Sequence, residues 1–549
     1  MLDQSTHEAA SVMPTHRRAL SPNELSYFLP SRADGLNDMF HGIKIHAPPS
    51  LISPLRVRIA WAIMRLRHSL LACRVEMPLG KYDEAEFVLR PPSSTGEAMA
   101  QAAATIRFFD DVTGRELMHA FLNGPRTLSS DKLSAVHIAR HGEISPGTHE
   151  FHIVYMLHHM INDSPAMYTT ENGMLELLGG SNTPGGPPRT DQELAAILDR
   201  EWMDRCGAQR IPHDAIIPAT EDRIQGLARS KFRDAAWVVD NKNIEKRFIG
   251  GHSFPRLKRK HRNMRWVEAR FDVAQTKAIM AQCKAKRVTL PNVIFALLNY
   301  AWIRLCASRR DLPERKDLPM LMYTAISTRR YLKPCSALDS YLSLALEYHN
   351  VVLPAFVPRH ISPVQAFWAR GREAQRQMFR HSHSPLMLQR SVASGMVRGQ
   401  RAKAWARIDD EADGTLPPTK HVSVPPPKPQ SGPKPPPSLA LLGITNAGDF
   451  WTNFFRPQTY PSITVQELAG MARKAPGSLF LASKTIKGRF TLAFLYDEPA
   501  FPPGMMEEFW RYVVDGVHEY VLEDNDLLGT AEEIDMLKGL LPFSAVARL

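Results

Sequence analysis

Short apolar runs alternate with longer stretches of helical spacing along the first part of the chain. Short runs rich in β-branched residues predict strands, and apolar residues at every third or fourth position predict helices that bury one face. A helix beginning at Pro54, for example, places Leu55, Ile59 and Ile63 on one face. Strands are predicted at 39–45, 73–77, 86–89, 106–109, 133–138 and 152–157, and helices at 54–70, 166–178 and 190–206.

A second series of elements begins near residue 265, after a polar and weakly periodic stretch. The segment 293–306 is apolar on nearly all sides, which predicts a helix buried in a core. Strands are predicted at 267–271, 319–326, 342–353, 439–444 and 488–496, and helices at 273–286, 293–306, 364–379 and from Pro503 onward. Strands and helices mixed in both halves predict an α/β protein.

The length of 549 residues is sufficient for two packed domains. We expect a flexible tail over 1–16, an N-terminal lobe over 17–205, a crossover linker over 206–264 and a C-terminal lobe over 265–549. A disordered insertion is predicted at about 399–438, and ten prolines cluster towards its end. Proline cannot donate hydrogen bonds to a strand or helix, so this composition favours an exposed, polyproline-like segment.

The amount and distribution of charge limit the classes of binding partner that we expect. The net charge is +12 and the sequence pI is about 9.4, but the positive residues are spread along the chain apart from the run 256–262. No aromatic residues are interleaved with that run, so nucleic-acid binding is not expected. A basic surface suits equally well the phosphates of a nucleotide-bearing cofactor such as CoA.

Other compositional features exclude several classes. No run of eighteen apolar residues is present, so no transmembrane segment is predicted. The first fifteen residues lack the basic start and apolar core of a secretory signal. The cysteines form no CxxC pair, which argues against a zinc ribbon and against a disulfide framework. They are Cys73, Cys206, Cys283, Cys306 and Cys335.

The chain's main candidate site follows the predicted strand at 152–157. This strand ends in His158 and His159, and Asp163 lies four residues further on, beyond a turn. Ser164 offers an N-cap for the next helix, so the unit is a strand, a histidine-bearing turn and a helix. Successive strand side chains point to opposite faces, so only one of the two histidines needs to face a cavity.

The residue types leave several roles open. With 21 histidines in the chain, an HHxxxD string arises by chance with a probability on the order of a few per cent. The motif alone therefore does not establish a functional site, and the segments on either side of it must support the assignment. A neutral imidazole titrates near neutral pH and can act as a general base. Asp163 could orient that imidazole or form a structural ion pair with an arginine. His159 and Asp163 could also bind a metal ion, with His158 in support.

Several segments, in order along the chain, resemble the superfamily of CoA-dependent acyltransferases, which includes plant BAHD enzymes, nonribosomal condensation domains and fungal alcohol acetyltransferases. The HHxxxD motif is the specific feature. Two departures are Ser164, where the family often has glycine, and the absence of the plant DFGWG sequence, whose place 446–450 occupies. The other similar segments are 66–71, 286–304, the strand ending at Arg329, 442–446 and 489–496.

The resemblance implies two chloramphenicol-acetyltransferase-like lobes, each a mixed sheet flanked by helices, with an active-site channel between them. By resemblance His159 is the general base, His158 is a supporting residue on the packing side, and Asp163 is a structural carboxylate. The expected ion-pair partners of Asp163 are Arg329 or Arg330. Asn446 is the expected oxyanion donor, with a turn residue as the alternative. No GxSxG elbow is present, so direct transfer is expected without an acyl-enzyme.

The same resemblance implies that acyl-CoA is a co-substrate, that no cofactor or metal is bound, and that the acceptor is a hydroxyl-bearing small molecule or glycolipid. The chain length, the proline-rich segment and the terminal residues 547–549 resemble fungal glycolipid acyltransferases, in particular the peroxisomal enzymes that acylate mannosylerythritol lipid. Ala547-Arg548-Leu549 is similar to a peroxisomal address, so binding to the peroxisomal import receptor is expected. We expect a monomer, with peripheral membrane contact at most.

Two other functions remain open at this point. The first is a metal-dependent hydrolase that uses His159 and Asp163, although adjacent strand histidines point apart and no second cluster of regular ligand spacing is present. The second is a non-catalytic lipid-binding scaffold with the same fold. Release of free CoA in the presence of acyl-CoA and an alcohol would separate an enzyme from a scaffold.

Overall fold

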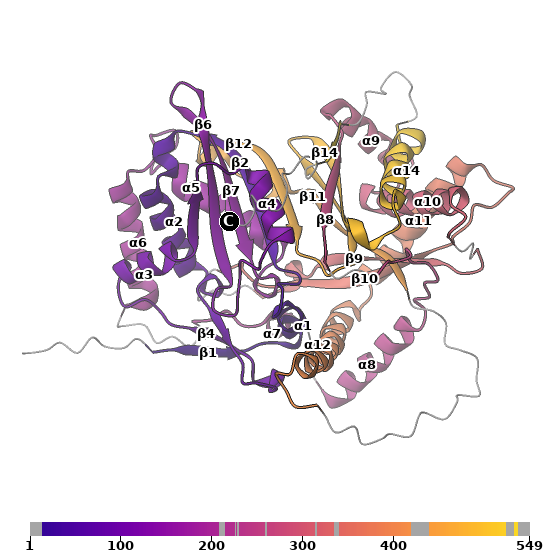
Figure 1. Ribbon diagram of the computed structural model, residues 1–549, viewed down its shortest axis with the longest axis horizontal. Coiled ribbons are helices and arrows are strands. Elements are labelled where there is room, and N and C mark those ends of the chain that lie inside the picture. Colours follow the sequence, from indigo (N-terminus) through magenta and orange to yellow (C-terminus); the bar gives the residue numbers. More distant parts are fainter. Residues whose placement is uncertain are drawn as a thin grey trace, which may run out of the picture.

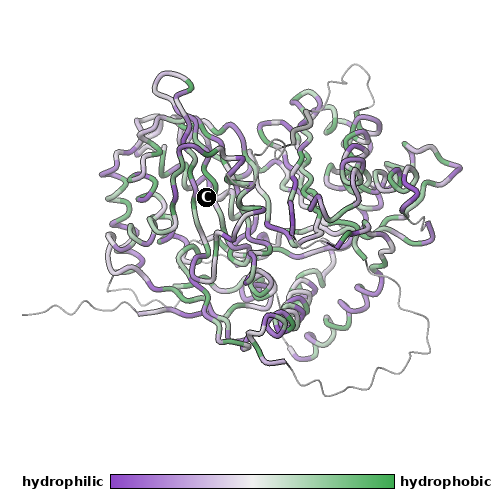
Figure 2. Tube along the Cα trace, in the orientation of Figure 1, coloured by the Kyte–Doolittle hydropathy of each residue, from purple (hydrophilic) through white to green (hydrophobic). Residues whose placement is uncertain are grey.

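The computed structural model describes residues 14–207, 215–225, 227, 230–258, 261–312, 316–333, 340–418 and 439–522, and the backbone of 532–535. Two mixed sheets lie side by side in Figure 1, each with helices on its outer side. Apolar residues concentrate in the sheets and in the helix faces against them, and the outermost helices are more polar (Figure 2). The predicted class, a two-lobed α/β fold, is confirmed.

The first lobe is built on a five-stranded sheet with the order β12-β2-β7-β6-β5. All neighbours are antiparallel except β5 and β6, which are parallel. Apolar residues on alternate positions of β7 make one face of this sheet part of the lobe core, where Ile153, Tyr155 and Leu157 are fully buried. The strands are β2 (Met39–Ala47), β5 (Ile106–Phe109), β6 (Ser134–Ser145), β7 (Thr148–Leu157) and β12 (Thr464–Ala472).

Helices cover the two faces of this sheet unequally. Four helices form the outer layer of the lobe, and a fifth packs on the face that looks towards the second lobe (Figure 1). The outer helices are α2 (Pro54–Arg67), α3 (Thr95–Ala103), α5 (Ser164–Gly179) and α6 (Asp191–Cys206), and the inner helix is α4 (Gly114–Asn123). Phe121 of α4 belongs to a separate apolar cluster that also contains Phe40 and Trp266. This cluster joins the two sheets, so the lobes share a core.

The second lobe is built on a seven-stranded sheet with the order β10-β9-β11-β13-β14-β8-β15. Strand β11 runs parallel to both of its neighbours, and the other pairs are antiparallel. The strands are β8 (Met264–Arg270), β9 (Met320–Ser327), β10 (Leu346–Leu353), β11 (Ala440–Asp449), β13 (Leu479–Ile486), β14 (Arg489–Asp497) and β15 (Glu532–Asp535). Its helices are α9 (Val273–Ala285), α10 (Leu290–Ser308), α11 (Pro363–Ser382) and α14 (Met505–Tyr520).

Helix α10 is the central helix of this second core. Among the described residues it is the one helix with the length and apolar composition to cross a membrane, yet 72% of its most apolar window is buried in the protein. It packs against α11 and α14, and Trp302 and Leu298 are almost fully buried. The all-round apolar pattern is therefore explained by a buried core position.

The expected C-terminal lobe over 265–549 is wrong at one strand. Strand β12 leaves the second lobe and pairs with β2 over most of its length, from Thr464 opposite His46 to Ala472 opposite Met39, with a register shift between Val465 and Glu467. It therefore becomes the edge strand of the first sheet. Without β12, β2 would be an edge strand with unpaired backbone N–H and C=O groups. Antiparallel pairing with β12 supplies hydrogen-bond partners for these groups.

Three other expected boundaries also change. The last residue of the tail expected over 1–16 belongs instead to β1 (His16–Ala19), which pairs with β4, and residues 1–13 lie outside the described residues. The crossover over 206–264 contains two helices, α7 (Thr220–Arg223) and α8 (Lys231–Glu245). The first part of the insertion expected at about 399–438 belongs instead to the helix α12 (Met387–Ala412), and this part lacks proline. Residues 419–438 and 547–549 lie outside the described residues.

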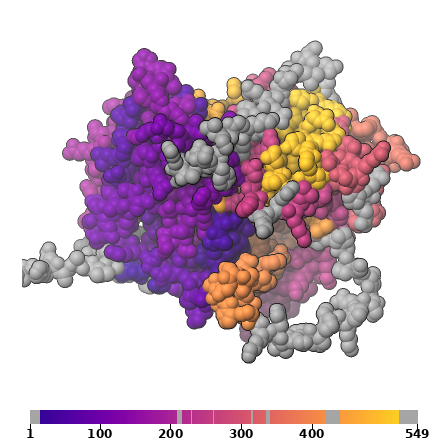
Figure 3. Space-filling model, viewed as in Figure 1, coloured from indigo at the N-terminus to yellow at the C-terminus, as the bar shows by residue number. Residues whose placement is uncertain are grey.

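Helix α12 crosses under the first lobe and packs lengthwise on α1 (Pro22–Ser31), as the orange and indigo surfaces of Figure 3 show. Gly399 allows this approach, since a Cβ there would lie 2.7 Å from the Pro22 carbonyl oxygen. The remaining elements are β3 (Arg74–Glu76), β4 (Glu86–Leu89), α13 (Phe450–Phe454), and the short 3₁₀ helices η1 (Pro49–Ile52), η2 (Ser69–Leu71), η3 (Tyr82–Glu84), η4 (His159–Ile161), η5 (Arg329–Tyr331), η6 (Pro457–Thr459) and η7 (Glu498–Ala500).

Candidate active site

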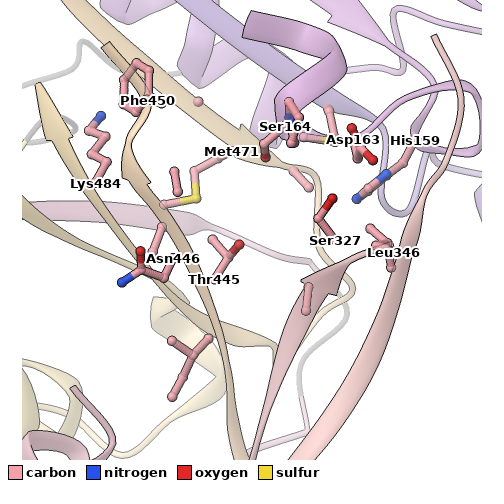
Figure 4. Close-up of a pocket in the computed structure, with 18 of the residues that line it drawn as sticks. His159, Asp163, Ser164, Ser327, Leu346, Thr445, Asn446, Phe450, Met471 and Lys484 are labelled. Carbon is pink, nitrogen blue, oxygen red and sulfur yellow. The ribbon is translucent and has the colours of Figure 1, made fainter. Parts of the chain in front are cut away.

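A cavity of about 1000 Å³ lies between the two lobes and contains His159 in its wall. The turn η4 that follows β7, the start of α5, the C-terminal ends of β9 and β11, the start of β10 and the crossing strand β12 all contribute residues to its wall. In Figure 4, His159 and Asp163 face Ser327 and Leu346 at one end of the cavity, and Lys484 and Phe450 lie at the other. Both lobes are therefore needed to form the site.

A hydrogen bond to a backbone carbonyl oxygen fixes the tautomer of His159. Its Nδ1 lies 2.9 Å from the carbonyl oxygen of Asn162, which can only accept, so Nδ1 carries the proton. The Nε2 atom is left as an acceptor in the wall of the cavity. The ring packs against Tyr27, with centroids 4.6 Å apart. Burial lowers the pKa of His159 to about 4, and the charge of Lys474 acts in the same direction, so the imidazole is neutral at physiological pH.

His158 follows the last residue of β7, does not line the cavity and is 1% exposed. Its Nδ1 accepts from the Met160 amide at 3.3 Å, so its Nε2 carries the proton and donates to Ser31 Oγ at 2.6 Å. Burial holds its pKa well below the ordinary value. His158 therefore joins the 3₁₀ turn η4 to α1 and has no free ring nitrogen.

Asp163 is the N-cap of α5, a position that the sequence pattern had assigned to Ser164. Its Oδ1 accepts from the Ala166 amide at 3.1 Å, and its Oδ2 accepts from the Ala345 amide at 3.2 Å. Arg329 adds a two-pronged ion pair, with Nη2 2.7 Å from Oδ1 and Nε 3.0 Å from both oxygens. Arg329 also donates to the carbonyl oxygens of Tyr341 and Ser343. This network fixes the start of α5 to the end of β9, across the two lobes.

These contacts argue against two alternative roles for Asp163, that of a metal ligand and that of the carboxylate that orients His159. Both oxygens of Asp163 are engaged by Arg329 and backbone amides, and neither accepts from His159. The single grouping of described His, Cys, Asp and Glu residues with metal-binding spacing lies elsewhere, at His141, Glu150 and His152. A hydrolase site at His159 and Asp163 is therefore not supported by the geometry.

Arg330 and Asn446 also line the cavity, but their present contacts are local. Arg330 is exposed, and its guanidinium stacks on Tyr331. The Oδ1 of Asn446 accepts from the Gly448 amide at 2.7 Å, which is a turn contact. Asn446 lies on β11, on the side of the cavity opposite His159 (Figure 4). Its Nδ2 group remains available as a donor.

Lys474 is a cavity residue that sequence reasoning missed. It follows the end of β12, and its Nζ lies 4.5 Å from the centroid of the Phe480 ring. No hydrogen bond or ion pair joins its ammonium group to another described residue. Burial lowers the pKa of Lys474 to about 8, so the group is mostly charged at neutral pH. A single lysine at this position carries no sequence signal, because its location in the cavity wall depends on β12 crossing to the first sheet.

His41 and Glu171 form a second pair beside the cavity that the sequence did not reveal. His41 Nδ1 lies 3.0 Å from Glu171 Oε1, and burial raises the pKa of Glu171. The imidazole fits beside β12 because the residue opposite is Gly470, where a Cβ would lie 2.4 Å from the ring. His41 lines the cavity and packs against Tyr168. This pair is a rival to His159 for acid–base chemistry.

The cavity is strongly cationic. One carboxylate, Asp163, lines it among the described residues, and that group is already paired with an arginine. The cationic side chains in its wall are Arg329, Arg330, Arg398, Arg401, Lys474 and Lys484. Such a surface attracts anionic ligands and disfavours cationic ones.

No protein-family model and no curated protein matches this sequence. Solved structures do. A trichothecene 15-O-acetyltransferase, TRI3 from Fusarium sporotrichioides, superposes with a TM-score of 0.65 at 13% identity, over 91% of this chain and 94% of that one. The epimerization domain from the third module of tyrocidine synthetase B gives a TM-score of 0.54 at 10% identity, over 93% and 98% of the two chains.

The condensation domain of the Monacolin K polyketide synthase MokA is also similar, with a TM-score of 0.51 at 14% identity over 93% of this chain and 98% of that one. At these identities the likeness establishes the fold. The chain therefore has the two-lobed fold of CoA-dependent acyltransferases and condensation domains, as its sequence pattern predicts.

Proposed function

We propose that this protein is an O-acyltransferase that moves an acyl group from CoA to an alcohol, with His159 as the general base. The observation that carries the proposal is the open Nε2 of His159, an acceptor in the wall of a cavity between the lobes of an acyltransferase fold. Six cationic side chains in the same wall favour a phosphate-bearing donor such as acyl-CoA.

The reaction follows from this geometry. The Nε2 of His159 takes the proton of the acceptor hydroxyl as its oxygen attacks the thioester carbonyl carbon. The carbon–sulfur bond then breaks, and His159 returns the proton to the departing thiolate. His159 makes no hydrogen bond to a described serine or cysteine, which favours direct transfer over an acyl-enzyme. Lys474 supplies the positive charge that stabilises the oxyanion, with Asn446 Nδ2 as the second candidate donor.

For the acceptor, we propose a sugar hydroxyl of a glycolipid. Apolar and aromatic side chains share the cavity with the polar groups, so a lipid tail and a sugar both have suitable surfaces. The apolar lining includes Met39, Tyr168, Phe450, Phe454, Leu468 and Met471. Mass spectrometry of products from acyl-CoA with a glycolipid, the free sugar or a fatty alcohol tests this. Equal turnover of the free sugar would contradict the glycolipid assignment.

Replacing Lys474 with methionine is expected to lower kcat by about 10²-fold, the order of loss seen when one oxyanion donor is removed. The melting temperature is expected to hold or rise, because methionine keeps the stem on Phe480 and removes a partly buried charge that has no ion-pair partner among the described residues. Lys474→Arg restores the charge and should recover part of the rate. Full activity in Lys474→Met would exclude this electrostatic role.

Activity is expected to have a broad pH optimum bounded by two groups. Below about pH 4 His159 becomes protonated and loses its role as a base, and above about pH 8 Lys474 loses its charge. The folded pKa of His159 lies below its unfolded value, so the unfolded chain takes up this proton first and stability falls as the pH drops from about 6.5 towards 4. Activity is measured at each pH and again after return to pH 7, which distinguishes loss of activity by titration from loss by unfolding. An alkaline limit unchanged in Lys474→Arg would contradict the assignment.

A further inference from the structure

A group of polar residues lies at the end of the first sheet that is furthest from the cavity, on the α4 face. Glu150 and His152 alternate on β7, so their side chains share that face, and His141 of β6 lies beside them. On the other side, His46 of β2 is directly opposite Glu150, and Lys44 is opposite His152. The group sits at the base of the β6–β7 hairpin, which projects at the top of Figure 1.

The ligand atoms of His141, Glu150 and His152 all lie within 4.8 Å of one another. The closest two are His152 Nδ1 and His141 Nε2, 3.2 Å apart, and their ring planes meet at 82°. In a tetrahedral zinc site, bonds of about 2.0–2.1 Å place two ligand nitrogens about 3.3 Å apart. The two imidazoles are therefore already spaced as neighbouring ligands of one ion.

Supporting contacts hold these side chains in place. Glu150 Oε2 accepts from Lys44 Nζ at 2.9 Å and from His46 Nε2 at 3.1 Å, and Oε1 makes no hydrogen bond to another described residue. The imidazole of His152 packs against the first residue of α4, Gly114, where a Cβ would lie 2.3 Å from the ring. Hydrogen-bonded carboxylates and sterically fixed imidazoles are typical of the surroundings of metal ligands.

We propose that His141, Glu150 and His152 bind a transition-metal dication, with Zn²⁺ as the best match, in a structural site that fastens the β6–β7 hairpin to the sheet. The mixed nitrogen and oxygen ligand set suits zinc, and water completes the coordination. His152 and His159 are separated by seven residues of β7 and its end, which is about 23 Å of extended chain. The site therefore has no direct role in acyl transfer.

The test uses the full-length protein after chelation and dialysis. Zinc content measured after addition of Zn²⁺ and desalting is expected to reach one ion per chain, and Zn²⁺ is expected to raise the melting temperature. His141→Ala and Glu150→Gln should each lower the bound zinc at least tenfold and remove the thermal shift. His383→Ala, an exposed histidine on the C-cap of α11, is the matched control and should change neither.

Wild-type protein without bound zinc, or variants that keep a full equivalent, would overturn the proposal. Co²⁺ replaces Zn²⁺ in a parallel titration, where tetrahedral coordination produces strong visible absorption that both variants should lose. Acyl transfer is expected to be equal in the metal-free and zinc-loaded proteins. Zinc binding and acyl transfer are thus measured separately, and failure of one leaves the other standing.

Discussion

His159→Ala is expected to lower kcat for acyl transfer by about 10²–10⁴-fold, the contribution of a positioned general base. Among the described residues the side chain makes one hydrogen bond, from Nδ1 to the Asn162 carbonyl oxygen, and one ring contact, with Tyr27. Its loss should therefore leave the melting temperature nearly unchanged. Steady-state release of CoA from acyl-CoA, together with thermal unfolding of the same preparation, measures both quantities.

The control for this prediction is His41→Ala. His41 lines the same cavity and is paired with Glu171, so it is the other histidine with geometry suited to proton transfer. If His41→Ala abolished turnover while His159→Ala retained it, the base would be His41. A folded His159→Ala protein with near-normal kcat would by itself contradict the assignment.

Arg329→Ala is expected to lower the free energy of unfolding by about 3 kcal/mol, because it leaves the buried carboxylate of Asp163 without its cation. Asp163 is 3% exposed, and Arg329 provides three of its contacts while holding two carbonyl oxygens of the 340–345 segment. Asp163→Asn should weaken the same network less, because the amide oxygen still caps α5. Urea titration measures both losses.

Arg330→Ala is the matched control, because it removes the neighbouring arginine, which is exposed and stacks on Tyr331. Its free energy of unfolding is expected to change by less than about 0.5 kcal/mol, as for most surface substitutions. Asp163→Asn that kept full stability but lost turnover would contradict the structural role. That result would favour Asp163 as a residue that orients His159.

Local sequence patterns predicted much of the first lobe. Most of its strands and helices occur close to the predicted positions, because alternating or helical apolar spacing reports directly which face is buried. The expectation that only one of the two histidines faces the cavity agrees with the lining, which includes His159 and not His158, although both residues lie beyond the end of β7. The choice between Arg329 and Arg330 could not be made in this way, because it depends on how the 3₁₀ turn η5 aims each side chain across the lobes.

The sequence patterns did not predict features that depend on pairing between strands far apart in the chain. Strand β12 joins a sheet whose other strands lie more than 300 residues earlier, and nothing in its own residues specifies that partner. The positions of Lys474 and of Gly470 beside His41 follow from this pairing, so the sequence patterns did not reveal this part of the cavity wall either. The first part of the segment 399–438 was misjudged because the later prolines dominated its composition, although its own residues suit the helix α12.

The most direct test of the central claim is release of free CoA from acyl-CoA in the presence and absence of an alcohol acceptor, with the acylated product identified by mass spectrometry. Direct transfer predicts that CoA release depends on the acceptor, that one ester forms per CoA released, and that the protein mass is unchanged throughout. CoA release without an acceptor together with a stable acylated protein would contradict direct transfer. No turnover with any alcohol by the folded wild-type protein would favour the non-catalytic scaffold.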